Sequence, residues 1–119
     1  MLSTLCADEH QRFTGAGPRV AKALAQGRDP PQQLLDAMSA ICERAAAQGS
    51  RLWIDAEQQV FQPTIDRWTA DMMRRYNTNG EALVSLTLQA YLKSARGTLE
   101  KLLRQAHSGG WTLGIKLVR

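Results

Sequence analysis

The sequence predicts an α/β fold in which parallel strands alternate with helices. Three segments carry apolar residues at helical spacing, and shorter segments of strand character follow them. In one of these, 84–89, apolar and polar residues alternate with a period of two, which is typical of a strand whose two faces differ. Because strands separated by helices of this length are joined by right-handed crossovers, the sequence indicates a parallel sheet covered by helices.

The first expected helix lies between Asp29 and Gly49. Asp29 has a suitable N-cap side chain, two prolines follow it, and the glycine would end the helix. The apolar stripe of this segment consists of Leu34, Leu35, Met38, Ile41, Cys42 and Ala45. The segment 51–55 that follows is predicted to be a short strand.

The second expected helix lies within 62–80, where 77–80 has turn composition and ends the pattern. Its apolar face consists of Ile65, Trp68, Met72 and Tyr76. The strand after it lies within 83–91, and its polar row consists of Ser85, Thr87 and Gln89. A sheet covered on both faces usually has near-continuous apolar strands, so this polar row favours the inner face of a barrel close to a bound ligand.

The third expected helix lies within 92–106 and is ended by a serine and two glycines. Its inward residues would be Leu92, Ala95, Leu99, Leu102, Leu103 and Ala106. The last segment, 111–119, is predicted to be another strand. Near the start, 13–18 resembles a loop that leaves a strand, but the preceding residues are too polar to form that strand, so 1–12 is assigned to no element.

The composition favours one domain without a nucleic-acid partner. The chain has 119 residues and a net charge of +4, but its basic residues are scattered among acidic ones on the expected helices. This pattern is typical of solvated helix surfaces, and a nucleic-acid binder is the weakest alternative.

Cys6 and Cys42 have no metal-binding spacing and indicate a reducing compartment. No apolar run is long enough to span a bilayer, and Asp8 and Glu9 come too early for a signal or transit peptide.

Polar residues fall at the ends of the three expected strands. Asp55 ends the first strand, Gln89 ends the second, and Lys116 lies near the end of the third. In parallel β/α folds ligands bind outside the carboxyl ends of the strands, so these side chains suggest one shared site. Each also has a structural alternative: Asp55 as a cap of the next helix, Gln89 as a hydrogen-bonded inner amide, and Lys116 as a lysine that extends to solvent.

Three motifs resemble, in order and separation, the proline dehydrogenase (proline oxidase) family, especially its eukaryotic mitochondrial branch. They are IDAEQ at 54–58, within a longer similar stretch at 51–77, then QAYLK at 89–93 and KLVR at 116–119. The resemblance covers roughly 13–119. It implies a TIM-type β/α barrel that holds FAD in a mitochondrion, oxidises L-proline to 1-pyrroline-5-carboxylate, and passes electrons to an acceptor such as a quinone.

The resemblance also implies roles for the strand-end residues. Asp55 would be the active-site aspartate beside the flavin, and Ala56 would contact the flavin through its backbone. Gln89 would hydrogen-bond the polar edge of the isoalloxazine. Lys116 would take the place of the basic residue near flavin N5, where a fixed cation stabilises the negative charge that the reduced flavin gains.

Further positions follow from the same resemblance. Val118 and Arg119, at the end of the third motif, would belong to the cofactor-binding residues. The family usually has a lysine two residues before a serine or threonine on the preceding strand. This sequence has Arg12 before Thr14, so Arg12 is the candidate for that contact with the substrate.

The resemblance implies only part of a barrel. A complete barrel needs on the order of 250 residues, so 13–119 would be a partial barrel domain with about three or four strands, and 1–12 a segment apart from it. The expected function is FAD-dependent proline dehydrogenase activity, present as an incomplete fragment that is inactive alone. The alternative is a non-catalytic α/β remnant or interaction module. In either case the polar row of the incomplete sheet would have nothing to pack against.

Overall fold

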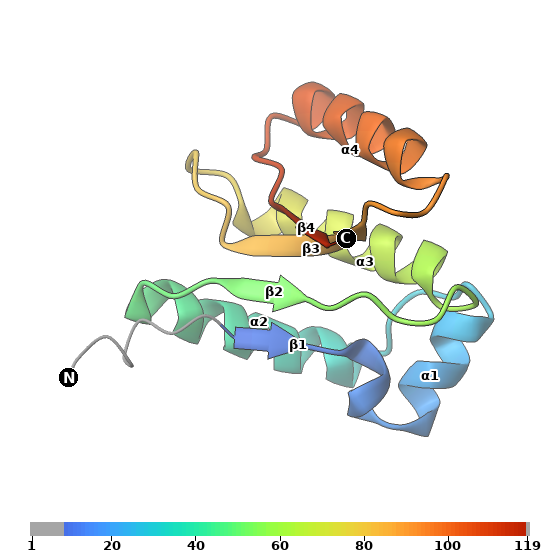
Figure 1. The fold of residues 1–119 in the computed structure, drawn as a ribbon. Helices are drawn as coiled ribbons and strands as arrows, with labels where there is room; N and C mark the ends of the chain where they lie inside the picture. The colour runs from blue at the N-terminus through green and yellow to red at the C-terminus, as the bar shows by residue number, and fades with distance from the viewer. Residues whose placement is uncertain (1–8, 119) are drawn as a thin grey trace.

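Strands and helices alternate along the computed structural model of the chain, which describes residues 9–118. The elements are β1 (Glu9–Gln11), the 3-10 helix η2 (Phe13–Ala16), α1 (Pro18–Ala25), α2 (Gln32–Gln48), β2 (Leu52–Ile54), α3 (Gln62–Tyr76), β3 (Val84–Gln89), α4 (Ala95–Gly109) and β4 (Ile115–Val118). Figure 1 shows α2 and α3 behind the strands and α4 above them.

The four strands of the described residues form one parallel sheet in the order β1-β2-β3-β4. Each strand therefore pairs with the strand next to it in sequence, as right-handed βαβ connections produce. The prediction of an α/β fold with a parallel sheet is confirmed. Because all strands run in the same direction, their carboxyl ends meet at one edge of the sheet.

The apolar face of the sheet forms the centre of the core. Leu52, Ile54, Val84 and Leu86 are completely buried on this face. The predicted helical stripes supply the opposite layer, since Leu34, Met38, Cys42 and Ala45 of α2 and Ile65, Trp68 and Met72 of α3 are buried. Leu103 is an exception, because it points away from the core and is 51% exposed.

Asn77 is the residue at which α3 ends, and its side chain forms hydrogen bonds with the backbone of two segments that follow the helix. Its side chain donates to the carbonyl oxygens of Val84 (2.8 Å) and Thr112 (2.9 Å) and accepts from the Val84 N–H (2.9 Å). Its own carbonyl accepts from the Thr112 N–H (2.9 Å). The residue is completely buried, so it ties α3 to the entrances of β3 and β4 without leaving a polar group unpaired.

Two sequence-based expectations about the first third of the chain are wrong. The segment judged too polar for a strand forms β1, because an edge strand needs only backbone pairing on one side and tolerates polar side chains. Asp29 does not cap α2, which begins after Pro31 with no side-chain cap. The residue before a proline is disfavoured in helical geometry, so the helix starts only beyond the two prolines. The short helix α1 was not expected either.

Candidate functional site

Asp55, Gln89 and Lys116 all lie at the same edge of the sheet. Asp55 directly follows β2, Gln89 is the last residue of β3, and Lys116 lies within β4, where it pairs with Thr87. Asp55 also continues the pairing of β2, because its N–H donates to the Gln11 carbonyl oxygen of β1 (2.9 Å). The sheet register thus places these strand ends next to one another in sequence order.

Asp55 contacts a histidine that sequence reasoning did not identify. The Nδ1 atom of His10, on β1, lies 3.1 Å from Asp55 Oδ1, and the Asp55 side chain is about one-third exposed (32%). The alternative in which Asp55 caps the next helix is wrong, because α3 begins after Phe61 with no side-chain cap. The imidazole therefore orients the carboxylate at the sheet edge.

Trp53 connects His10 with Lys116. The His10 and Trp53 rings are stacked, with centroids 6.4 Å apart and an interplanar angle of 22°. The Lys116 Nζ atom also lies over the Trp53 ring, 5.8 Å from its centroid. A contact of this kind contributes about 0.5–1 kcal/mol where solvent has access. We call His10, Trp53, Asp55 and Lys116 the inner-face cluster.

The inner-face cluster explains the burial of the polar row on β3. Trp53 pairs with Ser85, and Lys116 pairs with Thr87, so the Lys116 side chain crosses β3 to reach Trp53. Ser85 and Thr87 are only 2% and 7% exposed. The expectation that this row would have nothing to pack against is therefore wrong for these two residues. The Thr87 hydroxyl is buried without a hydrogen-bond partner in the structure.

The remaining predicted positions lie nearby but are less closely connected. The Gln89 amide donates to the Tyr91 hydroxyl, and no hydrogen bond described for residues 9–118 joins it to Asp55 or Lys116. Val118 pairs with Gln89, and its carbonyl oxygen accepts from the Ala90 N–H (2.8 Å). Ala56 follows Asp55 and is half-buried. Arg119 lies outside the described residues.

Glu57 is a second residue that sequence reasoning did not assign to the site. Its side chain is 3% exposed and accepts hydrogen bonds from the backbone N–H (3.3 Å) and the hydroxyl of Thr14. The Arg12 guanidinium lies 3.9 Å from the same carboxylate. The partners are more than 40 residues apart in sequence, so only the pairing of β1 with β2 reveals the contact.

A chain of hydrogen bonds continues from Glu57 into the helices. The Glu57 N–H donates to the Gln62 side-chain oxygen (2.8 Å), and the Gln62 amide donates to Asp66 (2.8 Å). Burial raises the pKa of Asp66, while the Gln62 hydrogen bond and the charge of Lys101 partly oppose that rise. The strand-end site is therefore connected to the interface between α3 and α4.

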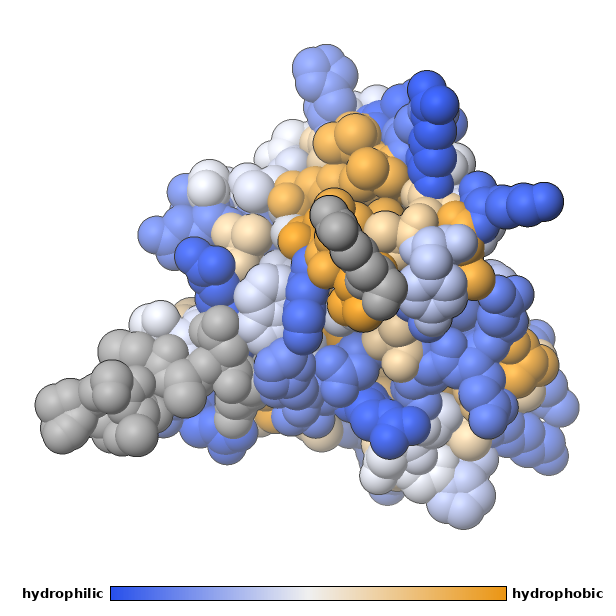
Figure 2. Space-filling view, viewed as in Figure 1, coloured by the Kyte–Doolittle hydropathy of each residue, from blue (hydrophilic) through white to orange (hydrophobic). Residues whose placement is uncertain are grey.

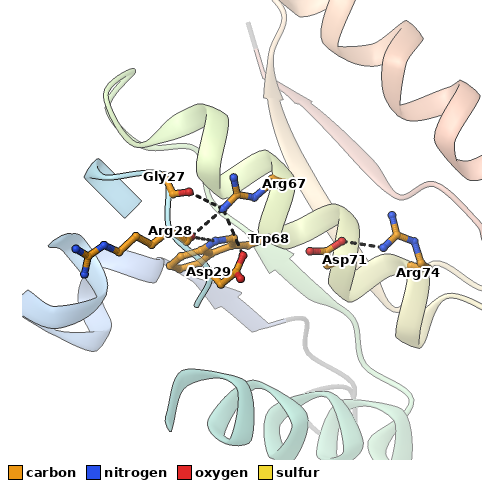
Figure 3. A network of polar contacts seen from close by, with 7 residues as sticks. All are labelled: Gly27, Arg28, Asp29, Arg67, Trp68, Asp71 and Arg74. Carbon is orange, nitrogen blue, oxygen red and sulfur yellow. Dashed lines mark hydrogen bonds and ion pairs between the residues drawn. The ribbon is translucent and has the colours of Figure 1, made fainter. Parts of the chain in front are cut away.

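A separate set of hydrogen bonds holds the loop between α1 and α2 against α3 (Figure 3). Arg67 donates to the carbonyl oxygens of Gly27 (2.9 Å) and Arg28 (2.8 Å), and the Trp68 indole donates to Arg28 (3.0 Å). Beside it, a cavity of about 600 Å³ opens between α2 and α3. None of the predicted site residues lines this cavity, which belongs mainly to the helical layer.

Within residues 9–118 no three His, Cys, Asp or Glu side chains are grouped closely enough to hold a metal ion. In the same range no helix is both long and apolar enough to cross a membrane. Cys42 is a buried free thiol, and burial raises its pKa to about 12.

The fold and the site together define a class of protein. A parallel β/α sheet carries a carboxylate directly after β2, an amide at the carboxyl end of β3 and a cation on β4, and ligand-binding β/α proteins carry such groups near their strand ends. A family model described as Proline dehydrogenase matches residues 3–119. The chain belongs to the proline dehydrogenase family.

Individual relatives agree with the family match. Proline dehydrogenase 1, mitochondrial, of Homo sapiens is 39% identical over 87 residues, which are 73% of this chain and 14% of that protein. The probable mitochondrial proline dehydrogenase of Schizosaccharomyces pombe is 39% identical over 79 residues, 66% of this chain and 16% of that protein. Hydroxyproline dehydrogenase of Rattus norvegicus is 31% identical over 115 residues, 85% of this chain and 25% of that protein. No solved structure matches the chain.

Proposed function

We propose that this chain contributes part of the barrel and part of the active site of an FAD-dependent proline dehydrogenase. The observation that carries the proposal is that Asp55 directly after β2, Gln89 at the end of β3 and Lys116 within β4 lie on successive strands of one parallel sheet, each within a motif of the family. The chain spans only 14% of its human relative, so the activity belongs to a protein that contains the rest of the barrel. L-Proline is the substrate, with hydroxyproline as the competing possibility that the rat relative's name raises.

In this proposal residues 13–119 form a partial β/α barrel domain. Four parallel strands in sequence order, with helices on one face, are half of the eight strands that a barrel contains. The opposite face carries the inner-face cluster and the polar row of β3, as the lining of a barrel would. The sheet extends this domain beyond the proposed start at residue 13, because β1 (Glu9–Gln11) is its first described strand.

The residues at the sheet edge have the chemistry that a flavin requires. The Gln89 amide can donate to and accept from the polar edge of the ring system, and Ala56 and Val118 offer backbone at the same edge. Lys116 supplies a fixed cation, and Arg119 would add another. When bound, FAD accepts the electrons that leave the substrate, and mitochondrial location with a quinone acceptor completes the proposal.

Asp55 and Arg12 are the proposed contacts for the substrate. Proline carries a carboxylate and an amino group, so its binding requires a cation and an anion at a suitable distance. Arg12 follows β1 and Asp55 follows β2, which places the two groups at adjacent strand ends. His10 lies beside Asp55 and supports the expectation that this carboxylate belongs to a charge network around the substrate.

The test is a chimeric enzyme. The segment of human proline dehydrogenase 1 that corresponds to residues 3–119, the range that the family model matches, is replaced by residues 3–119 of this chain, and flavin content and proline-dependent dye reduction are measured. We expect flavin retention and activity. Gln89→Leu should lower flavin content, and Lys116→Met should slow flavin reduction, because a cation matters most as negative charge develops. An active chimera whose flavin content and turnover are unchanged by both substitutions would remove these residues from the site.

A second candidate is the interaction module. Leu117 on β4 and Leu103 on α4 are 61% and 51% exposed, and apolar surface gathers where these elements lie (Figure 2). Such a surface is typical of a region that packs against more protein. A chimera that folds but neither binds flavin nor oxidises proline would favour this candidate.

A further inference from the structure

We propose that Glu57 is a positioning residue whose buried carboxylate locks the segment after β1 to the segment after β2. The lock holds the segment that contains Arg12 and Thr14 against the segment that follows β2. Its importance for catalysis rests on the proposed function, but the lock itself is a property of this chain and can be measured without any activity.

The contacts of Glu57 use both oxygens of its carboxylate. Oε2 accepts from the Thr14 N–H (3.3 Å), and Oε1 accepts from the Thr14 hydroxyl and lies 3.9 Å from the Arg12 guanidinium. The backbone N–H of Glu57 is also engaged, by the Gln62 side chain. Glu57 therefore connects the entrance to η2, the end of β2 and the first turn of α3.

Burial makes these contacts necessary. The Glu57 side chain is 3% exposed, and an ionised carboxylate that leaves water is costly unless donors or a cation replace its hydration. Thr14 supplies two donors, and Arg12 supplies the positive charge. If the segment after β1 moved away, the carboxylate would lose all three partners together, so the buried charge opposes that movement.

The segment that Glu57 holds is the one that carries the proposed substrate contact. Arg12 is mostly exposed, with 67% of its side-chain surface accessible, so little packing fixes its position. The hydrogen bond of His10 to Asp55 also joins the ends of β1 and β2, but His10 is half-exposed. Among the described side-chain links between these two strand ends, the Glu57 link is the buried one.

A neutral isostere would reverse part of this pattern. Glutamine keeps one acceptor oxygen and replaces the other with an NH2 group, so Glu57→Gln either places a donor against the Thr14 N–H or turns the Thr14 hydroxyl from donor to acceptor, with the NH2 group then facing Arg12. It also removes the charge that attracts Arg12. Thr14→Val deletes the hydroxyl at nearly constant volume, whereas Thr14→Ser keeps it. Glu81→Gln, in the exposed loop before β3, is the matched control.

The experiment is amide hydrogen exchange on the 119-residue chain, read at Thr14, Gly15 and Gly17 of the η2 segment and at Leu86 of β3. Glu57→Gln and Thr14→Val should each accelerate exchange in the η2 segment by at least about tenfold and leave Leu86 unchanged. Thr14→Ser and Glu81→Gln should exchange like the unchanged chain. If the Glu57 variant does not fold, the comparison of Thr14→Val with Thr14→Ser still decides the test.

Two results would overturn the proposal. One is unchanged exchange at Thr14 in Glu57→Gln or in Thr14→Val. The other is equal acceleration at Thr14 and at Leu86, which would assign Glu57 to global stability instead of positioning. Both results are independent of flavin binding, so they leave the proposed function untouched.

The catalytic consequence is tested in the chimeric enzyme. Glu57→Gln should raise the KM for proline by about tenfold with kcat changed less than threefold, because a displaced Arg12 weakens ground-state binding. A loss of about tenfold in kcat with an unchanged KM would contradict this catalytic consequence. A chimera that is inactive before any substitution would instead contradict the proposed function, while the hydrogen-exchange result would stand.

Discussion

At the scale of single residues, the site depends on side chains that meet across adjacent strands. Asp55 and Lys116 could be predicted from their place at strand ends and from the family motifs. His10 and Glu57 could not, because their partners are more than 40 residues away in sequence. The polar composition around His10 also argued against the strand that carries it. Sequence patterns report which face a residue occupies, whereas the pairing of distant strands decides which residues touch.

Asp55 should be far more important for activity than a carboxylate on the helical layer. In the chimeric enzyme Asp55→Ala should lower kcat/KM by about 100-fold, since it removes the anion from the charge network at the strand ends. Asp71→Ala is the matched control, because Asp71 is an exposed residue of α3 whose described ion pair is with Arg74. Its kcat/KM should stay within about twofold. Similar losses in the two variants would exclude Asp55 from the reaction.

Asn77 offers a stability test that needs no cofactor. Asn77→Ala leaves the buried Val84 N–H and the carbonyl oxygens of Val84 and Thr112 without their side-chain partner. The free energy of unfolding should fall by about 2–4 kcal/mol in denaturant titrations. Asn79→Ala, two residues further and exposed, should change it by less than about 0.5 kcal/mol. Equal changes would contradict the role assigned to Asn77.

At the scale of secondary-structure elements, regular periodicity was predictable and short elements were not. The stripes of α2 and α3 have enough turns to repeat, so the buried residues match the pattern. β1 has three residues and α1 has eight, too few for either period to be recognised. Leu103 fits the spacing of α4 yet is exposed, because periodicity cannot show how wide a face the neighbouring elements cover.

The contact between α3 and α4 should depend on pH through Asp66. Burial raises its pKa above the ordinary 3.8, so the folded state holds the proton to a higher pH than the unfolded chain does. The stability associated with the protonated form is present below pH 3.8 and is lost as pH rises through the folded-state pKa. Asp66→Asn cannot lose a proton and can still accept from Gln62.

The difference in stability between Asp66→Asn and the unchanged chain should therefore change with pH in a defined direction. Thermal unfolding measured from pH 3.5 upward should show the variant gaining relative stability as pH rises beyond 3.8. A difference that is constant with pH would show that Gln62 and Lys101 offset burial at this position, and a difference that falls would show that they outweigh it.

At the scale of the whole molecule, the described sheet has two edges and an uncovered apolar region. β1 and β4 each pair with one neighbour, and Leu117 and Leu103 are exposed near the β4 edge. Unpaired strand edges and exposed apolar residues promote association. We expect the 119-residue chain to form concentration-dependent oligomers in sedimentation velocity runs. Leu103→Lys combined with Leu117→Lys should shift it toward monomer, while a chain already monomeric at every concentration would contradict this prediction.

We propose that these residues supply part of a flavin site that only a complete barrel can close. The most direct measurement is the visible absorbance spectrum of two samples after purification with added FAD, recorded before and after anaerobic addition of L-proline. The chimeric enzyme should show the flavin spectrum and lose it on addition of proline, whereas the 119-residue chain alone should show neither. A chain that is yellow and bleached by proline on its own, or a folded chimera without flavin, would overturn this proposal.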